Sequence, residues 1–275
     1  MMRDYDRAEG VRWSCLSAMA TSPLEYQAQT IRCMTGESTP FMVRGSAVHC
    51  AVLQPDLFPL QYAVAPEGID KRTKVGKEAW QAFETANLGK TILTKSEYWE
   101  AISIRDAIRR HHPTASLLEA CEHREDAIYW TDEQTGLKCK ARIDAWGLYL
   151  FDLKTTARGI DPRRFASSMA QRLYHGQLAW YSWGLSQQPE HLARGWSPGK
   201  WFLGAAQSVT PYDVALYELS EDAMIAGAEL CRSLLDRLAE CIASDKWPGQ
   251  VPDCTVLDLP AWASDDEPIP VEEAA

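Results

Sequence analysis

The sequence predicts an α/β fold in which helices flank a central mixed sheet that carries acidic residues on its central strands. Helix-like and strand-like segments follow one another along most of the chain, and two neighbouring strand-like segments place aspartates in apolar surroundings. With 275 residues the chain is also long enough to bury a large core. We therefore expect one domain over residues 1–262 and an acidic, disordered tail over residues 263–275.

Three helices are expected before the sheet, at residues 14–23, 44–53 and 96–110. Ser14 and Ser96 are the expected caps of the first and third. In the second, Gly45 lies one turn before His49 and would let another backbone approach closely. A lone histidine on an apolar helix is more often a hydrogen-bonded core residue than a ligand, so His49 alone does not indicate a site.

The stretch between the second and third helices is the most basic part of the chain. Residues 66–95 contain Lys71, Arg72, Lys74, Lys77, Lys90 and Lys95. Such a run is usually a solvated face, and the alternative is an arm that contacts phosphates.

Strands and two helices are expected after residue 126. The strands lie at 127–130, 137–146, 149–154, 200–209 and 213–219, and the helices at 161–185 and 221–244. In the first of these helices Tyr174, Gln177 and Tyr181 share one face. An apolar core has no place for an unpaired Gln177, so this face indicates more than packing.

The strongest indication of chemistry is a pair of acids and a lysine on neighbouring strands. A three-residue turn would pair Trp146 with Leu150. The same register pairs Asp144 with Asp152 and places both carboxylates on the same side as Lys154. Two such carboxylates can hold Mg²⁺ and leave room for water and a phosphate oxygen. The lysine could steady the attacking water or the charge that develops on phosphorus.

A solvated cross-strand ion pair is the simpler explanation of these residues, because such pairs are common and contribute little. The flanking sequence argues against it. Apolar residues surround the acids and suggest a strand that is buried on at least one face: Leu148, Leu150, Phe151 and Leu153. Charges in such a place are costly unless a metal or a partner neutralises them.

The composition narrows the function classes. The net charge is −10, and half of it comes from five acids at positions 265–273, within the expected tail. This acidity argues against a protein that coats DNA, but it permits an enzyme that admits nucleic acid into a metal-lined channel.

The cysteines and the apolar runs exclude other classes. The eight cysteines form no C-x-x-C pair and are expected to be reduced thiols, mostly core fillers, without a zinc or iron–sulfur site. No apolar run approaches the ~20 residues of a membrane span. The first residues lack a secretory signal, so a cytoplasmic protein is expected.

An ordered set of motifs resembles a known family. The motifs occupy residues 45–50, 72–77, 125–130, 139–144, 152–156, 174–177 with Tyr181, and 259–262. In this order they resemble the nuclease domain of RecE, exodeoxyribonuclease VIII, a member of the PD-(D/E)XK superfamily that includes lambda exonuclease and the RecB and Cas4 nucleases. The resemblance implies a restriction-endonuclease-like core, with residues 66–115 as a basic DNA-contacting arm and helix.

Carried over by residue, the resemblance implies a metal site and a catalytic lysine. The implied metal ligands are His49, Asp144, Asp152 and the backbone carbonyl of Leu153. The implied catalytic residues are Asp144, Asp152, Lys154, Gln177 and Tyr181, with Glu125 at the family's acidic position on the first strand. The implied DNA-binding residues are Arg72, Lys74, Lys77, Tyr174 and Gln177. Ile143 stands where the family's classical motif has proline.

The resemblance also implies an activity. It is a Mg²⁺-dependent 5′–3′ exonuclease, able to use Mn²⁺, that resects linear double-stranded DNA to 3′ single strands for recombination by strand annealing. Its expected setting is a phage or prophage, its expected partner a single-strand annealing protein of the RecT or Beta type, and its expected assembly a homo-oligomeric ring.

Two other functions remain open at this stage. One is a DNA-end-binding recombination scaffold that keeps the fold without cutting, although such a protein would be expected to have lost one of Asp144, Asp152 or Lys154. The other is a nuclease of the same fold that acts on single strands or endonucleolytically. The absence of a four-cysteine cluster argues against the Cas4 type.

Overall fold

The computed structural model describes the whole chain apart from residues 1, 36–38, 190–197, 252 and 261–275. The expected disordered tail and the end of the last motif, Trp262, therefore lie outside the described residues. Among the described helices, none is both long and apolar enough to cross a membrane.

A five-stranded mixed sheet forms the centre of the protein, in the order β3-β4-β5-β6-β7. Its strands are β3 (Cys121–Thr131), β4 (Lys138–Gly147), β5 (Leu150–Thr156), β6 (Trp201–Gln207) and β7 (Val214–Glu218). β5 and β6 are parallel and the other neighbours are antiparallel. The expected mixed sheet is confirmed.

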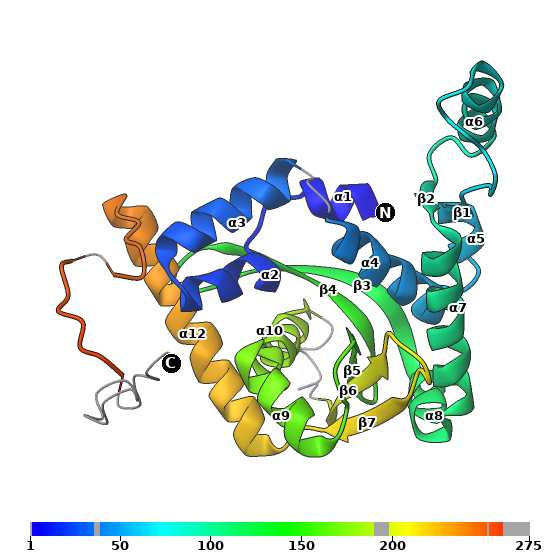
Figure 1. Ribbon diagram of the computed structural model, residues 1–275. Coiled ribbons are helices and arrows are strands. Elements are labelled where there is room, and N and C mark those ends of the chain that lie inside the picture. The colour runs from blue at the N-terminus through cyan, green and yellow to red at the C-terminus, as the bar shows by residue number, and fades with distance from the viewer. Residues whose placement is uncertain (1, 36–38, 190–197, 252, 261–275) are drawn as a thin grey trace, which may run out of the picture.

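Helices cover both faces of this sheet (Figure 1). On one side lie α2 (Trp13–Leu16), the 3-10 helix η1 (Ser17–Ala20), α9 (Pro162–Gln171), α10 (Tyr174–Ser186) and α12 (Glu221–Ser244). On the other lie α4 (Pro40–Leu53), α5 (Phe58–Gln61), α7 (Lys95–Arg110) and α8 (His112–Ala120). Each set packs its own apolar cluster against the sheet, so the sheet is buried on both faces.

The alternation along β5 is the one expected from the sequence. Leu150 packs in the cluster beneath α10, whereas Phe151 and Leu153 pack in the cluster beneath α4 and α7. Because successive side chains of a strand point to opposite faces, Asp152 and Lys154 lie on the α10 side. Two charged side chains are thus placed inside a layer of helices.

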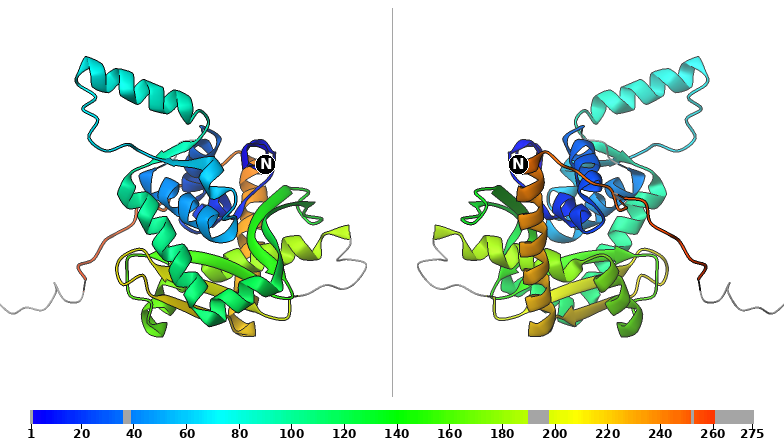
Figure 2. Two further views of the ribbon diagram at one scale, coloured as in Figure 1. Left: turned by 90° about the vertical axis from the view of Figure 1, so that its right-hand side faces the viewer. Right: turned by 90° about the vertical axis from the view of Figure 1, so that its left-hand side faces the viewer.

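The basic stretch forms a structure that the sequence did not suggest. A two-stranded parallel sheet of β1 (Tyr62–Val64) and β2 (Thr91–Leu93) carries α6 (Lys74–Ala86) between its strands. Figure 2 shows that α6 stands away from the body of the molecule. A Cβ on Gly76 would lie 1.9 Å from the backbone oxygen of Asp70, so the turn that starts α6 requires glycine there.

One expected helix is divided in two. Residues 161–185 were expected to form a single helix, but α9 ends at Gln171 and α10 begins at Tyr174. Leu173 between them has φ +56°, a left-handed conformation that cannot continue a right-handed helix. The shared face of Tyr174, Gln177 and Tyr181 survives, because all three belong to α10.

The N-terminal helices differ in their boundaries. Pro23 was expected near the end of a helix and instead begins α3 (Pro23–Thr35), which follows α1 (Met2–Arg7) and α2. Proline suits a first helical position because its missing N–H would be unpaired there anyway. The N-cap of α2 is Arg12 instead of Ser14. That of α7 is Thr94 instead of Ser96, and it forms a capping box with Glu97.

Gly45 also differs from expectation. Within the part of the chain that the structure describes, a Cβ at this position would meet nothing within 4 Å, so no described backbone approaches it closely.

Candidate active site

The turn between β4 and β5 has the expected register. Trp146 pairs with Leu150 and Ala145 with Phe151, and the N–H of Gly147 donates to the carbonyl of Tyr149 across the turn. Asp144 and Asp152 lie just beyond these pairs and are 6% and 1% exposed. Both carboxylates are thus buried beside each other on the two central strands.

His49 and Glu125 join Asp144 to form an acidic cluster. His49 Nδ1 from α4 lies 3.4 Å from Asp144 Oδ2 and 3.7 Å from Glu125 Oε1. Each of the three residues offers a ligand atom within 4.8 Å of the other two. The structure therefore places His49 in the site and not among the core residues.

The backbone of Glu125 aims its side chain into this cluster. Glu125 lies within β3 but has φ +49°, which is uncommon for a residue with a side chain. Arg142 Nε lies 3.1 Å from Glu125 Oε2 and holds the carboxylate from the neighbouring strand. The structure thus places Glu125, whose role the resemblance left open, beside His49 as a second acid next to Asp144. Arg142 was not singled out from the sequence, and only its position two residues before Asp144 pointed to it.

A second group of side chains connects Asp152 to α10. Lys154 Nζ lies 2.7 Å from Asp152 Oδ2 and donates to Gln177 Oε1 at 2.7 Å. Gln177 Nε2 in turn donates to the hydroxyl of Tyr181 at 2.6 Å. Lys154 Nζ also lies 4.5 Å from the ring centre of Tyr174, a cation–π distance. The expected face of α10 thus holds the ammonium group of Lys154 in place.

The acids favour positive charge at His49 and Lys154. Burial alone would lower the pKa of His49, but Asp144 and Glu125 outweigh it and raise this pKa to about 10. Burial likewise opposes the charged form of Lys154, yet Asp152 and Asp144 raise its pKa above the ordinary value.

The two aspartates respond in opposite ways. Burial raises the pKa of Asp152 to about 6, against the lowering effect of Lys154. For Asp144 burial is outweighed by His49, Lys154 and the Leu153 N–H, and the pKa is lowered. A pair of carboxylates with separated pKa values is a frequent property of active sites.

The residues at this site fit a divalent cation. The carboxylate oxygens of Glu125 and Asp144 already lie beside one positive charge, the protonated imidazole of His49. A bound cation would replace that proton, and the neutral imidazole would then offer a nitrogen ligand. Although Lys154 lies close to Asp152, neither buried carboxylate oxygen of Asp152 has a hydrogen-bond partner at suitable angles among the described residues. Buried polar atoms are rarely left in this state without a ligand or water. The Leu153 N–H donates to Asp144 Oδ2 at 2.7 Å, and a ligand role for the Leu153 carbonyl stays a prediction.

The cluster opens into a cleft of about 780 Å³ that is lined by the N-terminal helices, α4, the middle of β3, β4 and α10. His49, Glu125, Asp144, Gln177 and Tyr181 are among its lining residues. Lys74 and Lys77 lie instead on α6, and Arg72 just before it is exposed. The structure thus brings the expected metal and catalytic residues together and leaves the expected basic contacts on the separate arm.

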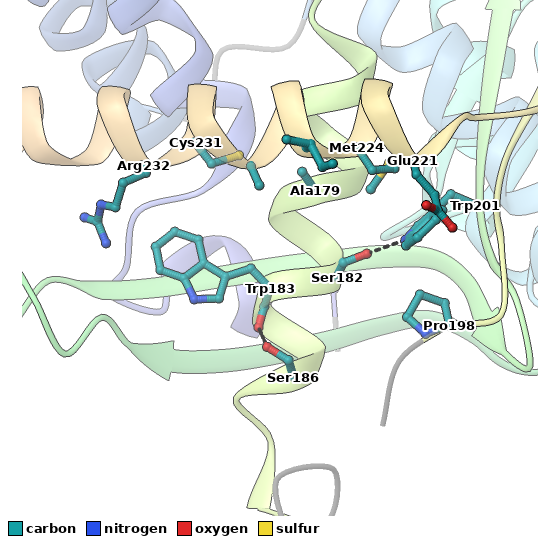
Figure 3. A pocket seen from close by; sticks show the side chains of 12 residues that line it. Ala179, Ser182, Trp183, Ser186, Pro198, Trp201, Glu221, Met224, Cys231 and Arg232 are labelled. Atoms are coloured by element: carbon teal, nitrogen blue, oxygen red, sulfur yellow. Dashed lines mark hydrogen bonds between the residues drawn. The ribbon is translucent and has the colours of Figure 1, made fainter. Parts of the chain in front are cut away.

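A second cavity, of about 650 Å³, lies between α10 and α12 (Figure 3). Its described lining is mostly apolar, and Trp201 Nε1 donates to Ser182 Oγ within it. Glu221 is the acidic side chain among the described residues that line it. It lacks the clustered acids of the cleft, so we place the candidate site in the cleft.

Comparisons with known proteins address the fold and the family of the chain. No curated protein matches the chain. A protein from Eubacterium rectale that is named as a candidate exonuclease shares the fold, with a TM-score of 0.58, 15% identity, and coverage of 92% of this chain and 90% of that one. A phage-related exonuclease from Haemophilus somnus 129PT is 13% identical over 88% of this chain and 99% of that one. Its TM-score of 0.37 is too low to establish a shared fold.

The model of one family, described as a PDDEXK-like domain of unknown function (DUF3799), matches residues 13–260. This match spans β3 to β7 and all the residues of the cluster. It confirms the PD-(D/E)XK resemblance drawn from the sequence. The chain belongs to this family of PDDEXK-like domains.

Proposed function

We propose that the protein is a divalent-metal-dependent exonuclease that degrades linear double-stranded DNA from its 5′ ends and leaves 3′ single strands. One observation carries the nuclease assignment. His49, Glu125 and Asp144 converge in the lining of a cleft, next to the buried pair of Asp152 and Lys154. Acids that gather around a cation beside a lysine are suited to phosphodiester hydrolysis.

His49, Asp144 and Asp152 would hold the cation, with Glu125 as a further ligand. Mg²⁺ is the proposed ion because carboxylate oxygens are its preferred protein ligands, and Mn²⁺ would substitute. When bound, the cation would polarise the scissile phosphate and lower the pKa of a water molecule.

Lys154 would supply a fixed positive charge at the reacting phosphate. Its ammonium group is anchored by Asp152 and by Gln177, which Tyr181 orients in turn. A donor that is already positioned costs little reorganisation when charge develops on phosphorus. The buried surroundings of Lys154 keep water from screening this charge.

The substrate and the biological role are proposed from the motif resemblance, and one neighbour in the fold is named as a candidate exonuclease. The arm residues Arg72, Lys74 and Lys77 would contact the DNA backbone, with Tyr174 and Gln177 near the active centre. A homo-oligomeric ring would place such arms around the duplex. A single-strand annealing protein of the RecT or Beta type would then take up the 3′ strand.

Digestion of labelled linear duplex in Mg²⁺ tests this proposal. We expect loss of the 5′-labelled end before the 3′-labelled end, no digestion in EDTA, and resistance of a covalently closed circle. Asp152→Ala should abolish digestion without unfolding the protein, whereas Glu240→Gln, on an exposed position of α12, should not affect it. Cleavage of the circle would indicate an endonuclease instead, and tight binding of ends without any cleavage would indicate the scaffold.

The role of the arm is tested separately. Replacing Lys74 and Lys77 by alanine should weaken binding of DNA of any sequence and reduce the slope of log K against log salt by about one per lost phosphate contact. Lys246→Ala, at an exposed position on the body, is the matched control. An unchanged slope in the double variant would remove the arm from the DNA interface.

A further inference from the structure

Two cysteines on neighbouring N-terminal helices are in direct contact. Cys15 lies on α2 and Cys33 on α3, and their sulfur atoms are 3.2 Å apart. Both are free thiols, Cys15 buried and Cys33 partly exposed. The sequence separates them by 18 positions and shows no C-x-x-C pattern, so only the packing of the two helices brings them together.

We propose that Cys15 and Cys33 are a site of reversible oxidation, at which a peroxide converts the two thiols into an intramolecular disulfide. This pair would then depart from the expectation of reduced thiols that mostly fill the core. The proposal is independent of the nuclease assignment, because it concerns two sulfur atoms that are not among the described ligand atoms of the acidic cluster.

The geometry favours a bridge between these two sulfur atoms. A disulfide bond is about 2.0 Å long, so the sulfur atoms must approach by only about 1 Å. α2 and α3 are joined through the short helix η1, so the bridge would draw two neighbouring helices slightly closer together.

The surroundings of the two sulfur atoms indicate which thiol the peroxide oxidises first. Arg12 Nε donates to Cys15 Sγ at 3.5 Å, and Gln29 Nε2 donates to Cys33 Sγ at 3.8 Å. Burial raises the pKa of the Cys15 thiol, and Arg12 opposes this effect. Cys33 is the more accessible to a small oxidant, so its thiolate reacts first. Cys15, held against it, is the resolving thiol.

The chemistry balances with hydrogen peroxide as the oxidant. The Cys33 thiolate attacks one peroxide oxygen, the O–O bond breaks, and a sulfenic acid and hydroxide form. The Cys15 sulfur then attacks the sulfenic sulfur, the S–S bond forms, and the sulfenic oxygen leaves as water with the Cys15 proton. The two thiols thereby lose two electrons, and two molecules of water are released in total once the hydroxide is protonated. A dithiol reductant reverses the reaction by thiol–disulfide exchange.

This pair lies at the wall of the active cleft. Arg12, Trp13 and Ser14, the three residues that precede Cys15, line the cleft. Trp13 packs so closely on α10 that a Cβ on Gly176 would lie 2.4 Å from its ring. Gly176 directly precedes Gln177, the partner of Lys154. A disulfide to α3 would thus tether α2, the helix that packs against α10 next to Gln177.

Peptide mapping tests the proposal directly. Trypsin cleaves after Arg12, Arg32 and Arg44, so it releases Cys15 and Cys33 on separate peptides, residues 13–32 and 33–44. After treatment of the folded full-length protein with hydrogen peroxide, we expect these two peptides to be joined, with the loss of two hydrogens. Two of the eight thiols should become unreactive, and dithiothreitol should restore both.

Three variants define the site. Cys15→Ser should prevent the link and leave a sulfenic acid at Cys33 that dimedone traps, whereas Cys33→Ser should prevent the link without giving a trapped product at Cys15. Cys254→Ser, at the exposed cysteine, should form the link as the wild type does. The wild-type map needs no variant, so a folding defect in a serine variant would not obscure the result. Oxidation of Cys33 to its sulfenic or sulfinic acid with Cys15 present but no link would overturn the proposal.

Discussion

Replacing Asp152 by asparagine should separate the free-energy cost of burying its carboxylate from the role of that carboxylate as a metal ligand. The two side chains have the same shape, and the position is 1% exposed, so packing is unchanged. Burial raises the pKa of Asp152 from 3.8 to about 6. At pH 8 the carboxylate is ionised, and this shift means that it destabilises the metal-free folded protein by roughly 3 kcal/mol.

The sign of this effect depends on pH. Because the pKa is raised, the cost is absent below the ordinary value of 3.8 and complete above about 6. Asparagine avoids the cost but deprives Lys154 of its ion-pair partner, while the hydrogen bond to Gln177 remains. We therefore expect Asp152→Asn in EDTA at pH 8 to be as stable as the wild type or more stable, by at most about 3 kcal/mol.

A divalent metal should make the wild type more stable than the Asp152→Asn variant. A cation at about 100 times its dissociation constant stabilises the folded wild type by about 3 kcal/mol, and the loss of a carboxylate ligand should remove most of this gain in the variant. Urea unfolding at pH 8, in EDTA and in Mg²⁺ or Mn²⁺, measures both quantities. Glu240→Gln makes the same change of a carboxylate to an amide at an exposed position and should respond to metal as the wild type does.

Two results would refute this reasoning. One is an Asp152→Asn variant that loses more than about 2 kcal/mol in EDTA, since the buried carboxylate would then be stabilising. The other is a variant that keeps the full gain from metal, since Asp152 would then not be a ligand.

Three further predictions concern charge and packing. Lys154→Ala should lower kcat on linear duplex by about 10²–10³, and an effect below tenfold would exclude a transition-state contact. Gly227→Ala places a Cβ 2.6 Å from a backbone carbonyl of α10 and should cost about 1–3 kcal/mol in urea unfolding, whereas Gly45→Ala, with open space around it, should be neutral or stabilising. Asp132→Asn breaks the ion pair with Arg232 and should cost about 3 kcal/mol at pH 7. Burial raises the pKa of Asp132, but Arg232 outweighs it and lowers this pKa, so the difference from the wild type should vanish as the pH falls below 3.8.

The local part of the site could be predicted from the sequence. The pairing of Trp146 with Leu150 and the common side of Asp152 and Lys154 follow from the two-residue period of a strand and the length of one turn. The shared face of Tyr174, Gln177 and Tyr181 likewise follows from the helical period. Such patterns depend on near neighbours in the chain, so they are visible without the fold.

Other features depended on contacts that the local pattern does not contain. The break at Leu173 and the helix α6 were missed, because Leu173 has no residue type that favours a left-handed conformation and α6 lies in a stretch dominated by charge. The motif resemblance named His49 as a ligand, although its position on an apolar helix favoured a core residue. The meeting of Cys15 and Cys33 had no counterpart in the sequence at all.

The amino-acid sequence by itself determined the fold class and which side of β5 carries Asp152 and Lys154, because backbone geometry repeats every two residues in a strand. Tertiary structure alone decided that His49, Glu125 and Asp144 meet with their ligand atoms within 4.8 Å of one another. These residues come from three elements separated by up to 95 positions. Their meeting depends on how α4 packs on the sheet and on the left-handed backbone of Glu125, which are set by the burial of the whole core.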